Sequence, residues 1–179
     1  MHRWDLILVR KVGVPAQPEL AMEAVVDGAR PIFIQNEDVI RSMGVPALDY
    51  RKRCEVALAE IERRRARYLQ GRQPVEVEGR VVIVVDDGVA TGATVKAALA
   101  ALRHHGCKEL VLAVPVAPAE SISQLRREVD SLVCLTTPER FAAIGYFYGD
   151  FRQVSDDEAI AILARFPTPA TKPQLAIGP

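Results

Sequence analysis

The sequence predicts an α/β protein of the three-layer α/β/α type with a mostly parallel central sheet. Short runs of β-branched and other apolar residues alternate along the chain with segments of helical periodicity, which is typical of this class. The runs at 81–85, 110–116 and 132–136 are apolar almost throughout, as expected for parallel strands that are buried on both faces. At 179 residues the chain has the length of one domain with a substantial core.

The first half of the chain is expected to contain two strands and three helices. The strands are expected at 5–9 and 31–35, and the helices at 18–26, 36–43 and 46–69. Pro18 suits the first turn of a helix, where its fixed φ fits and its missing N–H is not needed. Residues 10–15 are expected to form a basic loop. The charges of the helix at 46–69 include i,i+4 pairs such as Glu60 and Arg64, so they indicate a solvated face.

The second half of the chain continues the alternation and ends in a proline-rich segment. Helices are expected at 94–105, 118–128 and 157–166. Ser155 and Glu158 have the spacing of a capping box at the start of the last helix. Residues 167–179 contain four prolines and no periodicity. We therefore expect one domain at 1–166 and a Pro-rich flexible tail at 167–179.

The composition favours a cytoplasmic protein without nucleic acid or membrane partners. Lys and Arg together number 23, and so do Asp and Glu, which leaves no net charge to attract either kind of polyanion. No apolar run is long enough to span a bilayer, and the N-terminus lacks the apolar stretch of a signal peptide. Cys54, Cys107 and Cys134 form no metal-binding pattern, and their odd number fits a reducing compartment.

The most informative stretch is 81–94, which reads as a strand, an acidic pair, a loop of small residues and the start of a helix. Free backbone N–H groups and the positive end of the helix dipole converge where a helix begins, and they suit a phosphate group. Gly92 and Ala93 allow close approach of the backbone, and Thr91 and Thr94 add hydroxyl donors. The acidic pair can accept hydrogen bonds from a diol, so the stretch predicts a sugar-phosphate site.

Other interpretations of this stretch fit less well. No Gly-Lys-Ser/Thr ends the loop, which excludes a Walker motif. The acids precede the loop and the glycines are misplaced, which excludes a dinucleotide-binding fingerprint. The remaining alternative is a strand–turn–helix in which an acid only caps the helix, but a cap needs one acid rather than two adjacent ones.

The stretch resembles the binding motif for 5-phosphoribosyl-1-diphosphate in type I phosphoribosyltransferases. The resemblance implies that two acids hold the ribose hydroxyls and that the loop from Ala90 to Thr94 cradles the 5-phosphate. The substrate-binding residues that it implies are Asp86, Asp87, Gly88, Val89, Ala90, Thr91, Gly92, Ala93 and Thr94. It also implies Mg²⁺ as the cofactor, which Asp86 and Asp87 would contact through the ribose or a water molecule.

The resemblance extends over most of the chain, to a group of bacterial phosphoribosyltransferase-like proteins of unassigned substrate. The matching stretches are 5–13, 36–39, 81–94, 113–118 and 153–156. Members of this group usually carry a further strand and helix, with a Pro-Arg-Gly-Gly loop that holds diphosphate, before the equivalent of Asp5. This sequence is expected to lack them. Related enzymes for 6-oxopurines typically have an acid where Ala90 stands, which argues against hypoxanthine or guanine.

Arg10 and Lys11 are the best remaining candidates for holding the diphosphate, although a solvated basic turn explains them about equally well. The implied reaction is displacement of diphosphate at the ribose C1 by a nucleophile, commonly a base nitrogen, and no catalytic residue is assigned. The alternative is a non-catalytic sensor of a sugar phosphate or nucleotide on the same fold. The expected partners are 5-phosphoribosyl-1-diphosphate, an unidentified acceptor and a second copy of the chain in a homodimer.

The segment 144–151 contains four aromatic residues flanked by glycines. Such a cluster could stack on a planar base, or it could pack the last helix against the sheet. We favour packing for at least two of the four.

Overall fold

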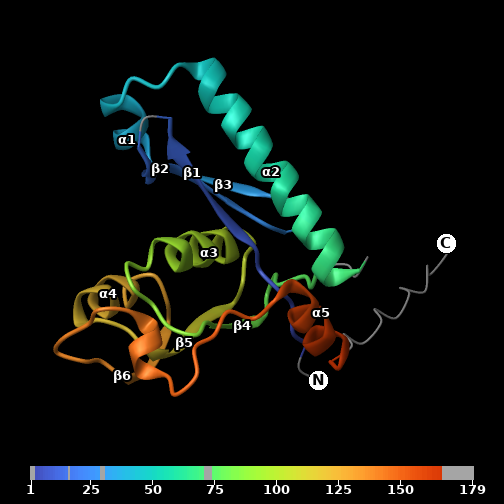
Figure 1. Ribbon diagram of the computed structural model, residues 1–179, viewed down its shortest axis with the longest axis vertical. Coiled ribbons are helices and arrows are strands. Elements are labelled where there is room, and N and C mark those ends of the chain that lie inside the picture. Colours follow the sequence, from blue (N-terminus) through green and yellow to red (C-terminus); the bar gives the residue numbers. More distant parts are fainter. Residues whose placement is uncertain (1–2, 16, 29–30, 71–73, 167–179) are drawn as a thin grey trace.

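The computed structural model describes residues 3–15, 17–28, 31–70 and 74–166. The expected tail at 167–179 lies outside these residues. The chain forms two three-stranded sheets, and Figure 1 shows the helix α3 (Ala93–His104) lying between them. Val26 packs on Ala97 and Ala101 on one side of α3, whereas Leu99 packs into a second core with the other sheet. The helix α3 therefore packs against both halves of the molecule.

The first sheet is antiparallel, with the order β1-β2-β3, and it corrects the expectations for residues 5–26. Its strands are β1 (Val9–Val14), β2 (Gln17–Val26) and β3 (Ile32–Gln35). The expected loop at 10–15 is thus part of β1, the expected helix at 18–26 is β2, and the expected strand at 5–9 begins only at Val9. The physical reason is that both faces of this sheet are covered. Neighbouring Val25 and Val26 are both buried, and such consecutive apolar residues mimic a helical pattern.

The β1–β2 hairpin is irregular, which is a second reason why the sequence pattern did not predict it. The register of the pair shifts on both sides of Gly13. A Cβ atom at Gly13 would lie 2.2 Å from the carbonyl oxygen of Pro18, so the backbones approach more closely than any other residue allows. Pro18 stands near this irregular end of the strand, where a missing N–H donor is tolerated.

Two helices follow the first sheet, as expected. The short helix α1 (Glu37–Ser42) is capped by the side chain of Asn36, which accepts a hydrogen bond from the N–H of Val39. The long helix α2 (Ala47–Leu69) buries Cys54, Ala57 and Ile61 against the face of the sheet that α3 does not cover. Figure 1 shows α2 running from the top of the view down to α5 (Asp156–Ala164).

The second sheet is parallel, with the order β4-β5-β6, which confirms the α/β class. Its strands are β4 (Val81–Val85), β5 (Glu109–Val116) and β6 (Ser131–Thr136), and α3 and α4 (Ala119–Leu125) connect them. Leu99, Leu110, Leu112 and Leu125 form the centre of its core and are fully buried. The carboxyl ends of the three strands meet at one edge, which is where ligands bind in such sheets.

One face of the parallel sheet is exposed within the described residues, contrary to the expectation that its strands are buried on both faces. Side chains alternate along β4 and β6, and α3 and α4 cover only one set. On the other face Val85 is 74% exposed and Leu135 is 78% exposed, and Val81, Ile83 and Val133 are also exposed. Among the described helices, none is both long enough and apolar enough to cross a membrane.

Candidate functional site

The stretch 81–94 forms the predicted strand, acidic pair, loop and helix. β4 ends at Val85, and α3 begins at Ala93. Of the nine residues 86–94, which form the loop and the start of the helix, six are exposed to solvent and three are buried. The exposed residues are Asp86, Asp87, Ala90, Thr91, Ala93 and Thr94, and the buried ones are Gly88, Val89 and Gly92. All four polar residues of this stretch are thus exposed to solvent, while Gly88, Val89 and Gly92 pack against the rest of the protein.

Three hydrogen bonds from distant segments hold this loop. The N–H of Val89 donates to the carbonyl oxygen of Val116 at 2.9 Å. The hydroxyl of Ser121, on α4, donates to the carbonyl oxygen of Ala90 at 2.5 Å. The hydroxyl of Tyr148 donates to the backbone carbonyl oxygen of Asp87. Sequence reasoning missed Ser121, for which no motif gives a signal, and it recognised Tyr148 only as part of an aromatic cluster.

Two glycines are required by the shape of the loop. Gly92 caps α3 with φ = 74°, in the left-handed region that side chains rarely adopt. At Gly88 a Cβ atom would lie 2.8 Å from Cγ2 of Ile144, which leaves no space for a side chain. The loop therefore has one backbone conformation in which both glycines are needed.

The first turn of α3 presents free backbone donors at the molecular surface. The first helical bond at this end runs from the N–H of Lys96 to the carbonyl oxygen of Gly92 at 2.8 Å. Within the described part of the chain, the N–H groups of Gly92, Ala93 and Thr94 have no protein acceptor. Because these donors lie at the positive end of the helix dipole, the geometry suits an anionic group such as phosphate.

The two acids lie beside these donors without a cationic partner among the described residues. The N–H of Asp87 donates to Oδ1 of Asp86 at 3.0 Å. Partial burial raises the pKa of the Asp86 carboxyl above its ordinary range, and the neighbouring Asp87 carboxylate raises it further. A carboxylate pair of this kind gains from hydroxyl donors or from a cation that a ligand brings.

The carboxylate oxygens of Asp86 and Asp87 could bind Mg²⁺ only if a bound ligand and water supply the remaining oxygen ligands. Among the described residues, no three His, Cys, Asp or Glu side chains gather closely enough to hold a metal ion. Mg²⁺ is commonly bound through one or two carboxylates together with water and substrate phosphates. Asp86 and Asp87 match that mode rather than a cage built by the protein alone.

Arg10 and Lys11 lie in β1 rather than in a loop, and this corrects their expected setting. Arg10 faces α2, where its Nη1 lies 4.0 Å from Oε1 of Glu60. Lys11 lies on the opposite face of β1, which is the face that carries Val9 and that packs against α3. The structure thus separates the two side chains onto the two faces of the first sheet instead of placing both beside Asp86.

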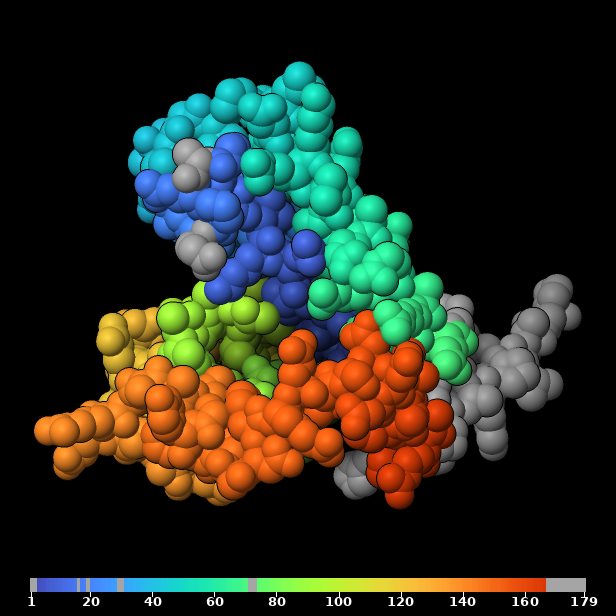
Figure 2. All heavy atoms as spheres, in the orientation of Figure 1, coloured from blue at the N-terminus to red at the C-terminus, as the bar shows by residue number. Residues whose placement is uncertain are grey.

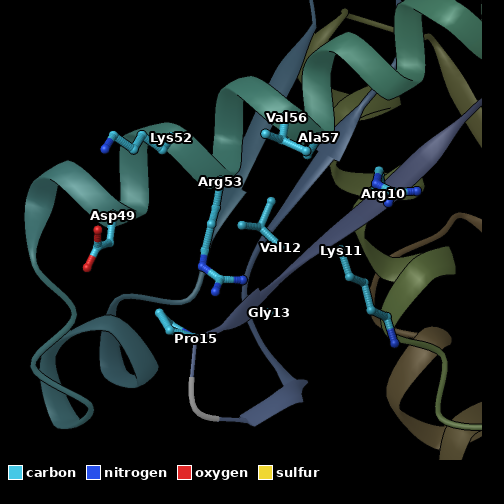
Figure 3. Close-up of a pocket in the computed structure, with 10 residues that line it drawn as sticks. All are labelled: Arg10, Lys11, Val12, Gly13, Pro15, Asp49, Lys52, Arg53, Val56 and Ala57. Carbon is cyan, nitrogen blue, oxygen red and sulfur yellow. The ribbon is translucent and has the colours of Figure 1, made fainter.

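A basic cavity of about 540 Å³ lies between β1 and α2. Four cationic residues and one acid are among those that line it, namely Arg10, Lys11, Lys52, Arg53 and Asp49. Figure 3 shows Arg53 reaching from α2 toward Gly13, while Lys52 and Lys11 point away from it. The positive charges therefore surround the cavity without converging on one point.

The aromatic segment 144–151 lies against the loop. It includes the 3₁₀ helix η1 (Ile144–Phe147). Phe147 stacks on Phe141 with ring centres 5.7 Å apart, and Tyr148 and Phe151 are 5.0 Å apart. Three of the four aromatic residues thus contact another aromatic ring of this region, although Phe147 and Phe151 remain 40% and 47% exposed. The fourth, Tyr146, is 80% exposed, so it is the aromatic residue of this segment that is available to a ligand.

Figure 2 shows a hollow between the first sheet with α2 and the segment that follows β5. The green region of β4 and α3 forms its floor.

Comparisons with known proteins agree with this geometry. The family described as the phosphoribosyl transferase domain matches residues 36–147. Two Mycobacterium tuberculosis proteins named as phosphoribosyl transferases, from strains CDC 1551 and H37Rv, are 44% identical over 163 residues. A uracil phosphoribosyltransferase of Finegoldia magna is 40% identical over 55 residues, which are 31% of this chain and 26% of that protein.

A solved structure shows the same fold. The crystal structure of TT1426 from Thermus thermophilus superimposes with a TM-score of 0.74 at 36% identity, over 90% of this chain and 76% of that one. The mycobacterial similarity also covers 90% of this chain, but the chain spans only 36% of the length of those relatives. On the evidence of the family match, the fold and the loop between β4 and α3, this chain belongs to the phosphoribosyl transferase domain family.

Proposed function

We propose that the protein binds 5-phosphoribosyl-1-diphosphate with Mg²⁺ at the loop 86–94 and transfers the phosphoribosyl group to a nucleobase. The observation that carries the proposal is the combination of free N–H groups at Gly92, Ala93 and Thr94 with the adjacent acids Asp86 and Asp87, which have no cationic partner among the described residues. The donors suit the 5-phosphate, and the acids suit the two ribose hydroxyls.

In this reaction a nitrogen of the base forms a bond to the ribose C1. The bond between C1 and the diphosphate oxygen breaks, the diphosphate leaves with the electron pair, and the nitrogen loses its proton. The chain's own residues contribute by holding both ends of the ribose phosphate rigidly, because the loop is fixed by Val116, Ser121 and Tyr148. Mg²⁺, when bound, offsets the negative charge of the diphosphate.

For the acceptor we propose a base other than a 6-oxopurine. Ala90 is exposed at the position where related 6-oxopurine enzymes have an acid. The local similarity to a uracil phosphoribosyltransferase favours testing uracil first. Tyr146 is the most exposed of the aromatic residues in the described segment 144–151, and it could stack on such a base.

A non-catalytic sensor of sugar phosphates is the second candidate, and a specific observation favours it. Arg10 and Lys11 lie in β1 on opposite faces of the first sheet, so these two expected diphosphate ligands do not converge on one group. A protein of this kind would hold the ribose 5-phosphate without turnover. A cytoplasmic homodimer is proposed for either function.

Calorimetry with 5-phosphoribosyl-1-diphosphate and Mg²⁺ tests the binding site. Asp86→Asn combined with Asp87→Asn should weaken binding at least about tenfold, because two charge-assisted hydrogen bonds to hydroxyls are lost. Asp38→Asn combined with Asp49→Asn is the matched control, since both residues are exposed acids remote from the loop. Unchanged affinity in the Asp86 and Asp87 variant would refute the ribose site.

Turnover then separates the two candidates. Diphosphate release is measured with uracil, cytosine, adenine, hypoxanthine and guanine in turn. Release with one base supports the transferase, whereas tight binding without release in any mixture supports the sensor.

A further inference from the structure

A second cavity, of about 410 Å³, lies between α2 and the strands β2 and β3, and we call it the α2 pocket. The residues that line it include Glu23, Phe33, Gln35, Tyr50, Cys54 and Leu58. It is on the face of the first sheet that is opposite to α3. Val26, Ile32 and Ile34 pack toward α3 on the other face, so the sheet separates the α2 pocket from the loop 86–94.

A buried carboxylate forms the base of the α2 pocket. Glu23 is 2% exposed, and no described Lys, Arg or His forms an ion pair with it. Its Oε2 accepts a hydrogen bond from the thiol of Cys54 at 2.7 Å, whereas its Oε1 is buried with no hydrogen-bond partner among the described residues. Burying a carboxylate with an unsatisfied oxygen is costly, so such a group in a cavity wall points to a missing donor.

The neighbouring polar groups are held in place by the strand register and by the helix repeat. Glu23 and Gln35 are directly opposite each other on β2 and β3. Tyr50 and Cys54 are one helical turn apart on α2. The amide of Gln35 donates to the hydroxyl of Tyr50 at 2.6 Å, and the Tyr50 hydroxyl interacts in turn with Glu23.

Gln35, Tyr50 and Cys54 are neutral. Arg51 also lines the α2 pocket, but it is exposed and none of the described ion pairs joins it to Glu23, so Glu23 has no ion-pair partner among the described residues. Burial, together with the Glu23 carboxylate, raises the pKa of Tyr50 above its ordinary range. The same two causes raise the pKa of the Cys54 thiol to about 12. Both side chains therefore stay protonated at neutral pH, and a ligand that carries positive charge or strong N–H donors is the complementary species.

An aromatic wall adds a preference for shape. Phe33 lies on the same face of the sheet as Gln35 and is 44% exposed although it is a large apolar residue. Leu58 continues the apolar side of the cavity on α2. A flat ring can lie on this wall while its polar edge points to Glu23.

We propose that the α2 pocket binds a planar ligand that presents an amidine-type pair of N–H donors to Glu23 and lays its ring on Phe33. Amidinium compounds and amino-substituted heterocycles both present such a pair of N–H donors. The site is separate from the loop 86–94, so its ligand is a different molecule from the sugar phosphate proposed for that loop. The inference does not depend on the function proposed above.

Benzamidine is the probe that tests the α2 pocket, because it joins one ring to one amidinium group. Binding is followed by ligand-observed NMR titration of the full chain, with neutral benzamide as the comparison compound. Benzamidine should bind, and benzamide should bind at least about tenfold more weakly, since it lacks the charge that Glu23 needs.

Three variants locate the binding. Glu23→Gln preserves the shape of the side chain and should weaken benzamidine binding at least about tenfold. Glu55→Gln is the matched control, because Glu55 also lines the α2 pocket but is exposed, and it should change binding by less than about twofold. Phe33→Ala should weaken binding about threefold or more through loss of the ring contact.

The outcomes are decisive. Thermal unfolding of each variant shows whether it is folded before it is titrated, and Phe33→Ala serves as the second test if Glu23→Gln does not fold. Absence of benzamidine binding to the unmodified protein would overturn the proposal, and so would equal losses in the Glu23 and Glu55 variants. Binding of 5-phosphoribosyl-1-diphosphate should be unchanged in Glu23→Gln, which keeps this test separate from that of the proposed function.

Discussion

At the scale of single residues, the candidate site depends on backbone conformation more than on side-chain chemistry. Gly92 has φ = 74°, and Gly88 faces Ile144 with no space for a Cβ atom. The requirement at Gly92 could be predicted from the loop pattern alone. The requirement at Gly88 could not, because Ile144 is remote in the sequence and only the folded chain brings the two together.

Replacing Gly92 by valine should impair binding while the fold survives. A Cβ atom there meets Leu125 and Val89 at ordinary contact distances of 3.5 Å, so the cost comes from the left-handed backbone. Such strain is on the order of 1–3 kcal/mol. We expect the affinity for 5-phosphoribosyl-1-diphosphate, measured by calorimetry, to fall at least about tenfold.

Gly149→Val is the control for this change. Gly149 lies in open space and has no positive φ, so valine there should leave the affinity unchanged. A folded Gly92→Val protein with the affinity of the unmodified chain would place the phosphate elsewhere.

At the scale of elements, sequence patterns succeeded where an element buries one face and failed where it buries two. The parallel strands, α2, α3 and the capping box of Ser155 and Glu158 were all predicted correctly. The strand β2 was mistaken for a helix, because α2 and α3 cover its two faces and bury consecutive residues. For the same reason Arg10 and Lys11 were assigned to a loop, although they are opposite-facing residues of β1.

The contact of α5 with α2 should be sensitive to pH through Asp156. The hydroxyl of Tyr68 donates to Asp156 at 2.5 Å, and Arg67 lies 2.6 Å from it. The hydrogen bond from Tyr68 and the charge of Arg67 lower the pKa of Asp156. The stabilisation is therefore complete above the ordinary pKa of an aspartate, about 4, and is lost as the pH falls through the lowered value.

Asp156→Asn should accordingly lower the midpoint of urea unfolding at pH 7, and the difference from the unmodified chain should shrink at about pH 3. Asp157→Asn is the control for the Tyr68 contact, since Asp157 is in the same first turn of α5 and also pairs with Arg67, at 3.1 Å, but it does not bond to Tyr68 and its side chain is 90% exposed. A loss that is equal in the two variants would assign the effect to the helix dipole instead of the Tyr68 contact.

At the scale of the whole molecule, the two faces of the parallel sheet differ. The helices α3 and α4 cover one face, and the other face is exposed in the described residues. Parallel sheets are usually covered on both faces. Here Val81, Ile83, Val85, Val133 and Leu135 form an apolar surface on strands of the same sheet. The sequence could not reveal this, because the apolar runs look the same whether a second layer covers them or not.

The exposed face should bind the dye 1-anilinonaphthalene-8-sulfonate in the native state. Ile83→Lys combined with Leu135→Lys should reduce the fluorescence of the bound dye several-fold. Leu48→Lys combined with Val56→Lys is the control, because these residues are similarly exposed, at 64% and 67%, but lie on α2. Equal reduction in both double variants would show that the dye binds without regard to this face.

The hydrogen bonds that hold the loop 86–92 also determine when the site can exist during synthesis. Ala90 is tied to Ser121, which is 31 residues later, and Asp87 is tied to Tyr148, which is 61 residues later. Long-range contacts form late because distant parts of the chain must first be brought together. All residues of the loop 86–92 are therefore synthesised well before the loop can take the conformation seen in the structure, because that conformation also needs Ser121 and Tyr148.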